Sequence, residues 1–325
     1  MPCILIGLRS GGLELQFQSE FHNRSDERPY EFVTIHVGSG TLSGQVPFLR
    51  RTRISRLRYE VQGVTVDSRD VHTKAMEDQI TVACNKEALA STLAKSVVEC
   101  FRKWNVENGR CVDKFFSLAL SGGSLPRTLA ELSKPEYKNE IAWSKCRIFF
   151  ADERCVPLTH PDSNFKACWD AFLRLVEIPE ANVVTIDPTK EPHECADLYA
   201  AKLEELPMRN GLPIFDLILL GMGPDGHTAS LFPEHALLLE EKRSVAAILD
   251  SPKPPSCRIT LTLPVLNNSS CVIFVTGGSE KAPVLAKILT EKSSEFPAGR
   301  VKPSYGKVLW LLDTESASRI PEGKL

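Results

Sequence analysis

Short runs of consecutive apolar residues alternate, over most of the chain, with stretches in which apolar residues recur every three or four positions. Uninterrupted apolar runs are typical of strands buried on both faces, and the longer spacing is typical of amphipathic helices. The predicted strands are 80–83, 115–120, 147–151, 183–186, 215–220, 245–249, 258–263, 271–275 and 308–312, and the clearest predicted helices are 85–101, 164–173, 194–206 and 280–289. This alternation predicts an α/β fold with a mostly parallel, doubly wound sheet flanked by helices.

The first 75 residues do not share this pattern. They hold only short strand-like pieces, such as Phe32–Ile35, among scattered glycine and serine residues. They lack the continuous apolar core of a signal peptide, and their early acidic residues are unlike a transit peptide. We therefore predict two parts: an atypical, poorly ordered extension at 1–75, to which we assign no function, and an α/β domain at 76–325. Met76 is an alternative start.

Bulk properties narrow the class of protein. The formal net charge of −2 gives no reason to expect nucleic acid or an anionic membrane as a partner. No apolar run approaches the roughly 18 residues that a membrane-spanning helix needs. The ten cysteines are dispersed and form no C-x-x-C pair, which is typical of a reducing compartment and of a protein without a zinc site. We predict a cytoplasmic protein without a metal ion.

One strand ends in an unusual cluster of residue types. After the apolar run 215–220 comes GMGPDGHT (Gly221–Thr228), and a short apolar run that predicts a helix start follows. Ligands of open α/β sheets bind at the carboxyl ends of strands, so His227 is better placed for chemistry than for packing. The segment also matches G-x-G-x-x-G, but Pro233 would end the crossover helix that a dinucleotide site requires. We expect no nucleotide cofactor.

Other predicted strands end in residues that suit an anion. Ser121–Ser124 (SGGS) opens a helix and can direct backbone amides at a phosphate, although the motif by itself favours a plain glycine turn with a serine cap. Arg154 can bind a phosphate with two donors or form an ion pair with Asp152 or Glu153. Lys281 lies early in a helix, where a cation opposes the helix dipole unless an anionic ligand is present.

His227 completes a chemically coherent set with these groups. Its unperturbed pKa near 6.5 suits a general base at neutral pH, and capping of its own helix is the alternative role. A phosphate cradle beside a histidine base points to a phosphorylated small molecule and to a hydrolytic or isomerising step. Spacing alone takes the inference no further.

Five motifs of the chain resemble those of 6-phosphogluconolactonases. They are LALSGGS (Leu118–Ser124), FADERCVP (Phe150–Pro157), DSN (Asp162–Asn164), GMGPDGHTASLFP (Gly221–Pro233) and RITLT (Arg258–Thr262). The resemblance implies hydrolysis of 6-phospho-D-glucono-1,5-lactone to 6-phospho-D-gluconate, the second step of the oxidative pentose phosphate pathway, without a cofactor. It also implies the fold of glucosamine-6-phosphate deaminases and ribose-5-phosphate isomerase. We expect this sugar-phosphate lactone as the only partner of a monomeric chain.

The resemblance also implies roles for single residues. His227 would deprotonate the water that attacks the lactone carbonyl, and Asp225 would orient or support His227. Arg154 and Lys281 would hold the phosphate, and Arg258 is a further anion-binding candidate.

The remaining candidates are backbone amides and supporting side chains. Within the Ser121–Ser124 loop, the amides of Gly122 and Gly123 would serve either the phosphate or the developing oxyanion. Asp152 and Glu153 would position Arg154 rather than transfer protons.

Two alternatives stay open. Glucosamine-6-phosphate deaminases or isomerases share the phosphate loop and a D-G-H turn, but their turn continues toward Asn-Glu-Pro, whereas Ser230–Pro233 follows here. Arg154 also stands where that family tends to carry an aromatic residue. A non-catalytic sugar-phosphate-binding protein would have lost the base, and His227 argues against it.

Overall fold

The computed structural model describes residues 79–111 and 113–324 and, before them, the backbone of six strands. The chain divides into two units, Met1–Ala75 and Met76–Leu325. Met76 and the side chains of the first unit lie outside the described residues, so the predicted poor order of 1–75 stays a prediction. Within the described residues, no helix is long and apolar enough to cross a membrane.

The first unit contains more regular strands than its sequence indicates. Four strands form an antiparallel sheet in the order β1-β2-β3-β4, and two more pair as an antiparallel hairpin. The predicted strand-like piece Phe32–Ile35 lies within the third of them. The bounds are β1 (Leu8–Ser10), β2 (Leu13–His22), β3 (Tyr30–Val37), β4 (Gly40–Pro47), β5 (Arg58–Val61) and β6 (Val64–Asp67).

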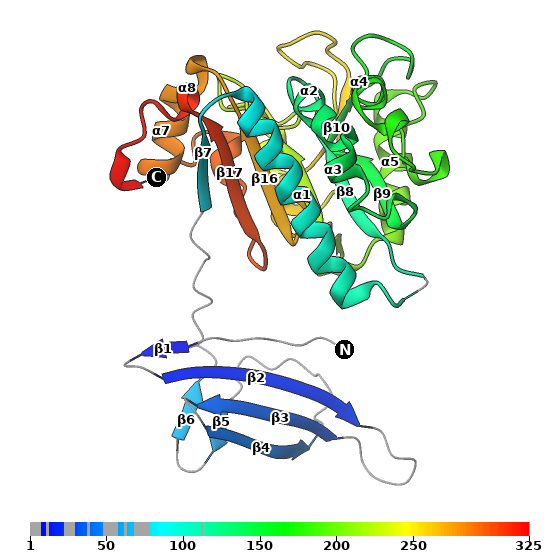
Figure 1. Cartoon of the computed structure of the whole chain (residues 1–325). Helices are drawn as coiled ribbons and strands as arrows, with labels where there is room; N and C mark the ends of the chain where they lie inside the picture. The colour runs from blue at the N-terminus through cyan, green and yellow to red at the C-terminus, as the bar shows by residue number, and fades with distance from the viewer. Residues whose placement is uncertain are drawn as a thin grey trace. The chain divides into compact units, whose positions relative to one another are not determined.

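The second unit is built on a six-stranded sheet whose described pairs are all parallel, as predicted (Figure 1). The strands lie in the order β7-β17-β16-β13-β8-β9. Their bounds are β7 (Gln79–Ala83), β8 (Phe116–Leu120), β9 (Cys146–Phe150), β13 (Leu217–Leu220), β16 (Cys271–Thr276) and β17 (Lys307–Asp313). The first strand of this unit therefore pairs with the last.

Successive residues of each strand enter two separate hydrophobic cores. In β13, Leu217 and Leu219 face one core, and Ile218 and Leu220 face the other. The first core is closed by α1 (Lys86–Asn108), α2 (Leu125–Leu129) and α4 (Asn164–Ala171), and the second by α5 (Pro192–Lys202) and α7 (Ala282–Thr290). Helices on both faces confirm the doubly wound architecture.

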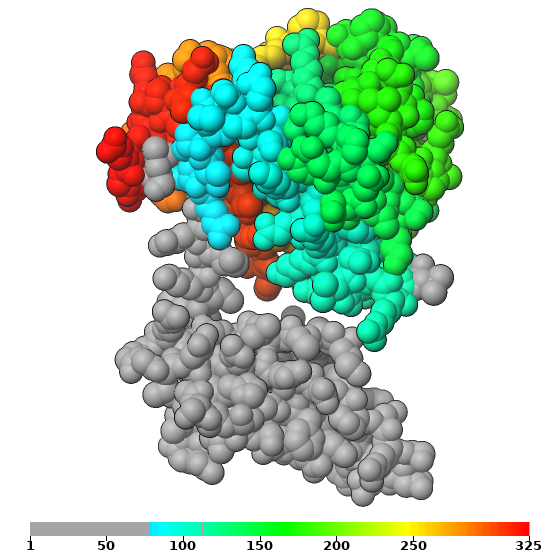
Figure 2. Space-filling model, in the orientation of Figure 1, coloured from blue at the N-terminus to red at the C-terminus, as the bar shows by residue number. Residues whose placement is uncertain are grey.

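Helix α1 illustrates how the sequence sets an element. It begins after Asn85, as predicted, because this side chain accepts a hydrogen bond from the amide of Ala88 at 2.8 Å. Leu93, Val97 and Phe101 share one face and are buried against the sheet. Figure 1 shows the helix lying across this face of the sheet. Each such side chain stabilises the fold by roughly 1.5–3 kcal/mol. Figure 2 shows the start of this helix beside the C-terminal segment, as the pairing of β7 with β17 requires.

A smaller sheet was not foreseen. The strands β10 (Asp152–Arg154), β15 (Arg258–Leu261) and β14 (Val245–Ile248) pair antiparallel, outside the parallel sheet. The remaining short elements are α3 (Pro135–Lys138), α6 (Leu263–Leu266), α8 (Thr314–Ala317), β11 (Met208–Arg209) and β12 (Leu212–Pro213).

Two predicted elements are wrong. The predicted strand 183–186 is reduced to a single bridge between Val183 and Ile148. The predicted helix start after His227 is instead a tight turn, in which Thr228 and Leu231 form an antiparallel bridge. Ala229 adopts a φ of 48° there, which no right-handed helix accommodates.

Because the six strands are parallel, their carboxyl ends meet at one edge. The strand order reverses between β8 and β13, since the chain proceeds from β8 to β9 on one side and then to β13 on the other. Such a switch point is where open α/β sheets bind ligands. The Ser121–Ser124 loop and the Gly221–Thr228 turn follow the two strands that flank it.

Candidate active site

The turn after β13 presents a histidine–carboxylate pair. Asp225 Oδ1 lies 2.5 Å from His227 Nδ1, and the imidazole stacks on Phe232 with the ring centroids 5.0 Å apart. The turn is closed by backbone hydrogen bonds between Gly223 and His227 (2.9 Å) and between Gly226 and Gly223 (2.9 Å). A Cβ on Gly223 would overlap the imidazole. The close approach of the pair to its own backbone therefore requires glycine at this position.

The distance between Asp225 and His227 assigns the tautomer. The ionised carboxylate of Asp225 can only accept a hydrogen bond, so at 2.5 Å Nδ1 carries the hydrogen, and Nε2 of the neutral ring keeps its lone pair. Burial lowers the pKa of His227 below its ordinary value of 6.5, although Asp225 opposes this change. Burial alone would raise the pKa of Asp225, but its hydrogen bond to His227 and the charges of His227 and Lys253 hold it below its ordinary value. The pair is thus a neutral base beside an ionised acceptor.

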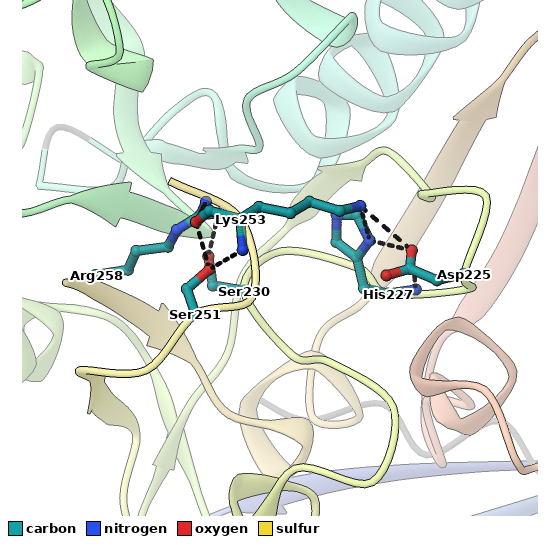
Figure 3. A network of polar contacts seen from close by, with 6 residues as sticks. All are labelled: Asp225, His227, Ser230, Ser251, Lys253 and Arg258. Carbon is teal, nitrogen blue, oxygen red and sulfur yellow. Dashed lines mark hydrogen bonds and ion pairs between the residues drawn. The ribbon is translucent and has the colours of Figure 1, made fainter. Parts of the chain in front are cut away.

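Lys253 is a member of this site that the sequence did not reveal. Its Nζ lies 3.2 Å from His227 Nδ1 and 3.5 Å from Asp225 Oδ1 (Figure 3). The available signal was a cation enclosed by prolines in Pro252–Pro255, between two predicted strands. Nothing in that pattern indicates that the loop folds over the histidine.

Asp152 connects the loops around the base. Its Oδ1 accepts hydrogen bonds from Ser121 Oγ (3.1 Å) and Asn164 Nδ2 (3.3 Å), and its Oδ2 accepts one from Ser230 Oγ (2.7 Å). The carboxylate is 3% exposed. Three loops that are far apart in the sequence are therefore held by one buried group, which explains the conspicuous DER motif better than proton transfer does.

The Ser121–Ser124 loop is shaped by Asn164. A Cβ on Gly122 would overlap the side-chain amide of Asn164, and Gly123 has a φ of 70°, in the left-handed region. Ser121 is buried, with its hydroxyl already bonded to Asp152, whereas Ser124 is exposed and forms no capping hydrogen bond. The backbone amides and Ser124, rather than Ser121, are the parts of the loop available to a ligand.

Glu153 organises the start of α4. Its carboxylate accepts hydrogen bonds from the amides of Asn164 (2.7 Å) and Phe165 (2.8 Å), from Ser163 Oγ (3.1 Å) and from the amide of Arg154 (2.8 Å). A carboxylate at a helix N-terminus is favoured by the free amides there. Burial nevertheless raises the pKa of Glu153, a change that these hydrogen bonds partly oppose.

Arg154 has unused capacity to bind an anion. Its Nη1 donates to the carbonyl of Asp162 at 2.7 Å, while its Nε is buried without a hydrogen-bond partner among the described residues. It is also the cross-strand partner of Arg258, and like charges directly opposite each other are destabilising. Within the described residues, no ion pair joins its guanidinium to Asp152 or Glu153, whose carboxylates bind amides and hydroxyls. That these two residues position Arg154 stays a prediction.

Arg258 forms hydrogen bonds within its own chain, and its predicted anion binding stays a prediction. Its guanidinium, 3% exposed, donates to the carbonyls of Lys253 (2.7 Å), Pro254 (3.3 Å) and Pro255 (2.9 Å) and to Ser230 Oγ (3.3 Å). It therefore fixes the loop that carries Lys253. Burial and the neighbouring charge of Arg154 lower the pKa of Arg258.

Lys281 is half-buried just before α7, in the segment that follows β16. No hydrogen bond or ion pair to its ammonium is described in the 79–324 region. Burial lowers the pKa of Lys281, although the charges of Glu280 and Asp313 oppose this change. The nearby backbone is held by Asp313, whose carboxylate accepts a hydrogen bond from the amide of Gly278 at 3.1 Å.

The structure connects some of the predicted site residues directly and leaves others apart. Asp225 and His227 are in direct contact. A hydrogen-bond network joins Asp225 through Lys253 and Arg258 to Ser230 (Figure 3) and continues from Ser230 to Asp152 and the Ser121 loop. Lys281 is not part of this hydrogen-bond network. Within the described residues, no group of three or more His, Cys, Asp or Glu side chains could hold a metal ion.

A cavity of about 260 Å³ lies elsewhere, at the ends of β7 and β17. It is lined by Cys84, Asn85, Lys86, Glu87, Asp313, Thr314 and Glu315. It includes neither the histidine nor the arginines described above, so this cavity is separate from the site around His227.

Comparisons with known proteins agree with this fold. The family model for glucosamine-6-phosphate isomerases/6-phosphogluconolactonase matches residues 84–310. A 6-phosphogluconolactonase of Homo sapiens is 46% identical over 208 residues, which cover 63% of this chain and 80% of that protein. The solved 6-phosphogluconolactonase from Trypanosoma cruzi has a TM-score of 0.65 at 32% identity and covers 76% of this chain and 98% of its own.

A monomeric glucosamine-6-phosphate deaminase shares the fold alone, at 18% identity and a TM-score of 0.60 over 74% of this chain and 99% of that one. The predicted fold, shared by both kinds of enzyme, is confirmed. The family model spans most of the α/β unit, and the 6-phosphogluconolactonase of Homo sapiens is 46% identical to this chain over 208 residues. The chain therefore belongs to the glucosamine-6-phosphate isomerase/6-phosphogluconolactonase family.

Proposed function

We propose that the chain hydrolyses 6-phospho-D-glucono-1,5-lactone to 6-phospho-D-gluconate, the second step of the oxidative pentose phosphate pathway. The observation that carries this proposal is the Asp225–His227 pair, which leaves a neutral imidazole with the lone pair of Nε2 as the base. The relatives named 6-phosphogluconolactonase support the same activity.

The base would act in the first step. His227 Nε2 takes a proton from water, and the resulting hydroxide forms a bond to the lactone carbonyl carbon. Asp225 holds the ring in the required tautomer and stabilises the imidazolium that forms. When the tetrahedral intermediate collapses, the bond to the ring oxygen breaks, and the imidazolium returns the proton to that oxygen. The products are a carboxylic acid and a free hydroxyl group, so the reaction consumes one water.

The phosphate would be held by Arg154 and Lys281. A buried Nε without a partner and a half-buried ammonium without a described ion pair are groups that an anion satisfies. The exposed part of the Ser121–Ser124 loop offers backbone amides to the phosphate or to the oxyanion, and Asp152 keeps this loop in place.

The state of the cysteines bears on the compartment in which the chain would act. Cys146, Cys168, Cys195 and Cys271 are buried as free thiols in the two cores, which supports a cytoplasmic, reducing environment. We propose a monomer that acts on a small sugar phosphate and requires no metal ion or cofactor.

The test is hydrolysis of freshly generated lactone, with wild type beside His227→Ala and with EDTA present. The lactone opens spontaneously, so the observable is acceleration above this background. Acceleration that survives chelation and falls by about 10²–10⁴-fold in the variant supports the proposal. A folded wild type that does not accelerate the reaction would overturn it, and deamination of glucosamine 6-phosphate would be measured next.

A further inference from the structure

The ammonium of Lys253 lies against the base pair, on the side of Nδ1. It is 3.2 Å from His227 Nδ1 and 3.5 Å from Asp225 Oδ1, and the side chain is 42% exposed. Figure 3 shows the side chain reaching from the Arg258 end of the network to the imidazole.

The proton between Asp225 and His227 limits what Lys253 can do. Since Nδ1 already donates its hydrogen to Asp225, Nδ1 has no lone pair for the ammonium. Lys253 can instead donate to Asp225 Oδ1, and its positive charge then lies beside the ring. This charge favours an ionised Asp225 and a neutral His227.

The loop around Lys253 is built independently of its ammonium. Ser251 Oγ donates to the carbonyl of Lys253 at 2.8 Å, and the amide of Lys253 donates back to Ser251 Oγ at 3.3 Å. Arg258 binds the carbonyls of residues 253–255 and lies over Phe232, the ring on which His227 stacks. Backbone contacts therefore deliver the side chain to the base, so its head group can be exchanged without removing the support.

We propose that Lys253 is a positioning residue: its ammonium holds Asp225 against Nδ1 of His227 and disfavours the imidazolium, so that the base stays unprotonated at mildly acidic pH. This inference rests on the proposed function for its catalytic meaning. Besides Lys253, the charged groups with the largest effect on His227 are Asp225 in its own turn and Asp152 of β10, and both favour the protonated ring. Arg258 lies over Phe232, on which His227 stacks. Of the charged groups with the largest effect, Lys253 acts in the opposite direction to the carboxylates, and it adds to the effect of burial.

The experiment follows the titration of His227 directly, by NMR of protein labelled with ¹⁵N-histidine and without substrate. Four proteins are compared: wild type, Lys253→Met, Lys253→Arg and the control Lys242→Met, which removes the same charge from an exposed lysine. In Lys253→Met the midpoint of His227 should rise by about 0.5–1 pH unit, because a nearby, partly screened cation is lost. Lys253→Arg should restore the wild-type midpoint, and Lys242→Met should keep it.

The acid limb of kcat/KM for the lactone should move by the same amount in the same variants. An unchanged His227 midpoint in a folded Lys253→Met protein would overturn the inference, as would an equal rise in Lys242→Met. The NMR measurement needs no turnover. Failure of wild type to hydrolyse the lactone would therefore refute the proposed function while the action of Lys253 on His227 is still decided.

Discussion

Replacement of Asp225 by asparagine tests the role of the pair most directly. The amide has nearly the shape of the carboxylate and can still accept the Nδ1 hydrogen, so the turn is retained while the charge is lost. A hydrogen bond to a charged acceptor contributes about 1.5–3 kcal/mol and one between neutral groups about 0.5–1.5 kcal/mol, a difference of about 1–1.5 kcal/mol. The imidazolium of the transition state loses an opposite charge as well.

The second contribution is reduced by solvent screening, because the Asp225 side chain is 37% exposed. We take it as about 1–2 kcal/mol. Together the two contributions amount to about 2–3.5 kcal/mol, which corresponds to a fall in kcat of roughly 30- to 300-fold. KM should change little, since the carboxylate is not expected to bind the phosphate.

The assay is lactone hydrolysis under saturating substrate, corrected for spontaneous opening. The chain offers a matched control in Asp250→Asn, because Asp250 Oδ1 also bonds a histidine, His235 Nε2 at 3.1 Å. This control should retain full activity. If Asp225→Asn keeps kcat within about twofold of wild type while folded, the carboxylate does not support the base and the reasoning is refuted.

Four further outcomes are expected. Arg154→Met should raise KM by about 10- to 100-fold with a smaller effect on kcat, through loss of charge-assisted phosphate bonds, and Arg174→Met serves as the exposed control. Gly122→Ala should lower activity at least about tenfold through its clash with Asn164, whereas Gly123→Ala, with open space around it, should cost only about 1 kcal/mol of unfolding free energy. Glu153→Gln should lower the free energy of unfolding by about 2–4 kcal/mol, since each carboxylate oxygen accepts two hydrogen bonds and the amide nitrogen that replaces one oxygen accepts none. The acid limb of wild-type kcat/KM should have its midpoint below pH 6.5, because burial lowers the pKa of His227; a midpoint above that value would contradict the assignment.

The sequence predicted most elements of the parallel sheet because buried strands and amphipathic helices have different periods. It could not separate β14 and β15 from that sheet, since an apolar run does not record which strand it pairs with. The bridge at Val183 and the turn at Ala229 were mispredicted for a related reason: local apolar residues suited a strand and a helix, and tertiary contacts decided otherwise.

The candidate site was predicted in its residue types but not in its connections. His227 and Asp225 were evident because they interrupt an apolar strand with a polar turn. The hub at Asp152, and Lys253 beside the base, depend on loops 78 and 26 residues away, respectively, along the chain. Such contacts follow from the fold as a whole, and no local pattern in the sequence encodes them.

The position of β17 has a consequence for the order in which a ribosome releases this chain. Among the described strands, β7 pairs only with β17, and β17 also closes on β16. The strand that emerges first in the α/β unit must therefore wait for the one that emerges last. Until about residue 313 has been synthesised, β7 has no partner and the face beneath α1 is incomplete. A nascent or C-terminally truncated chain would consequently expose apolar surface. The sheet that carries the site is complete only after β17 has been synthesised.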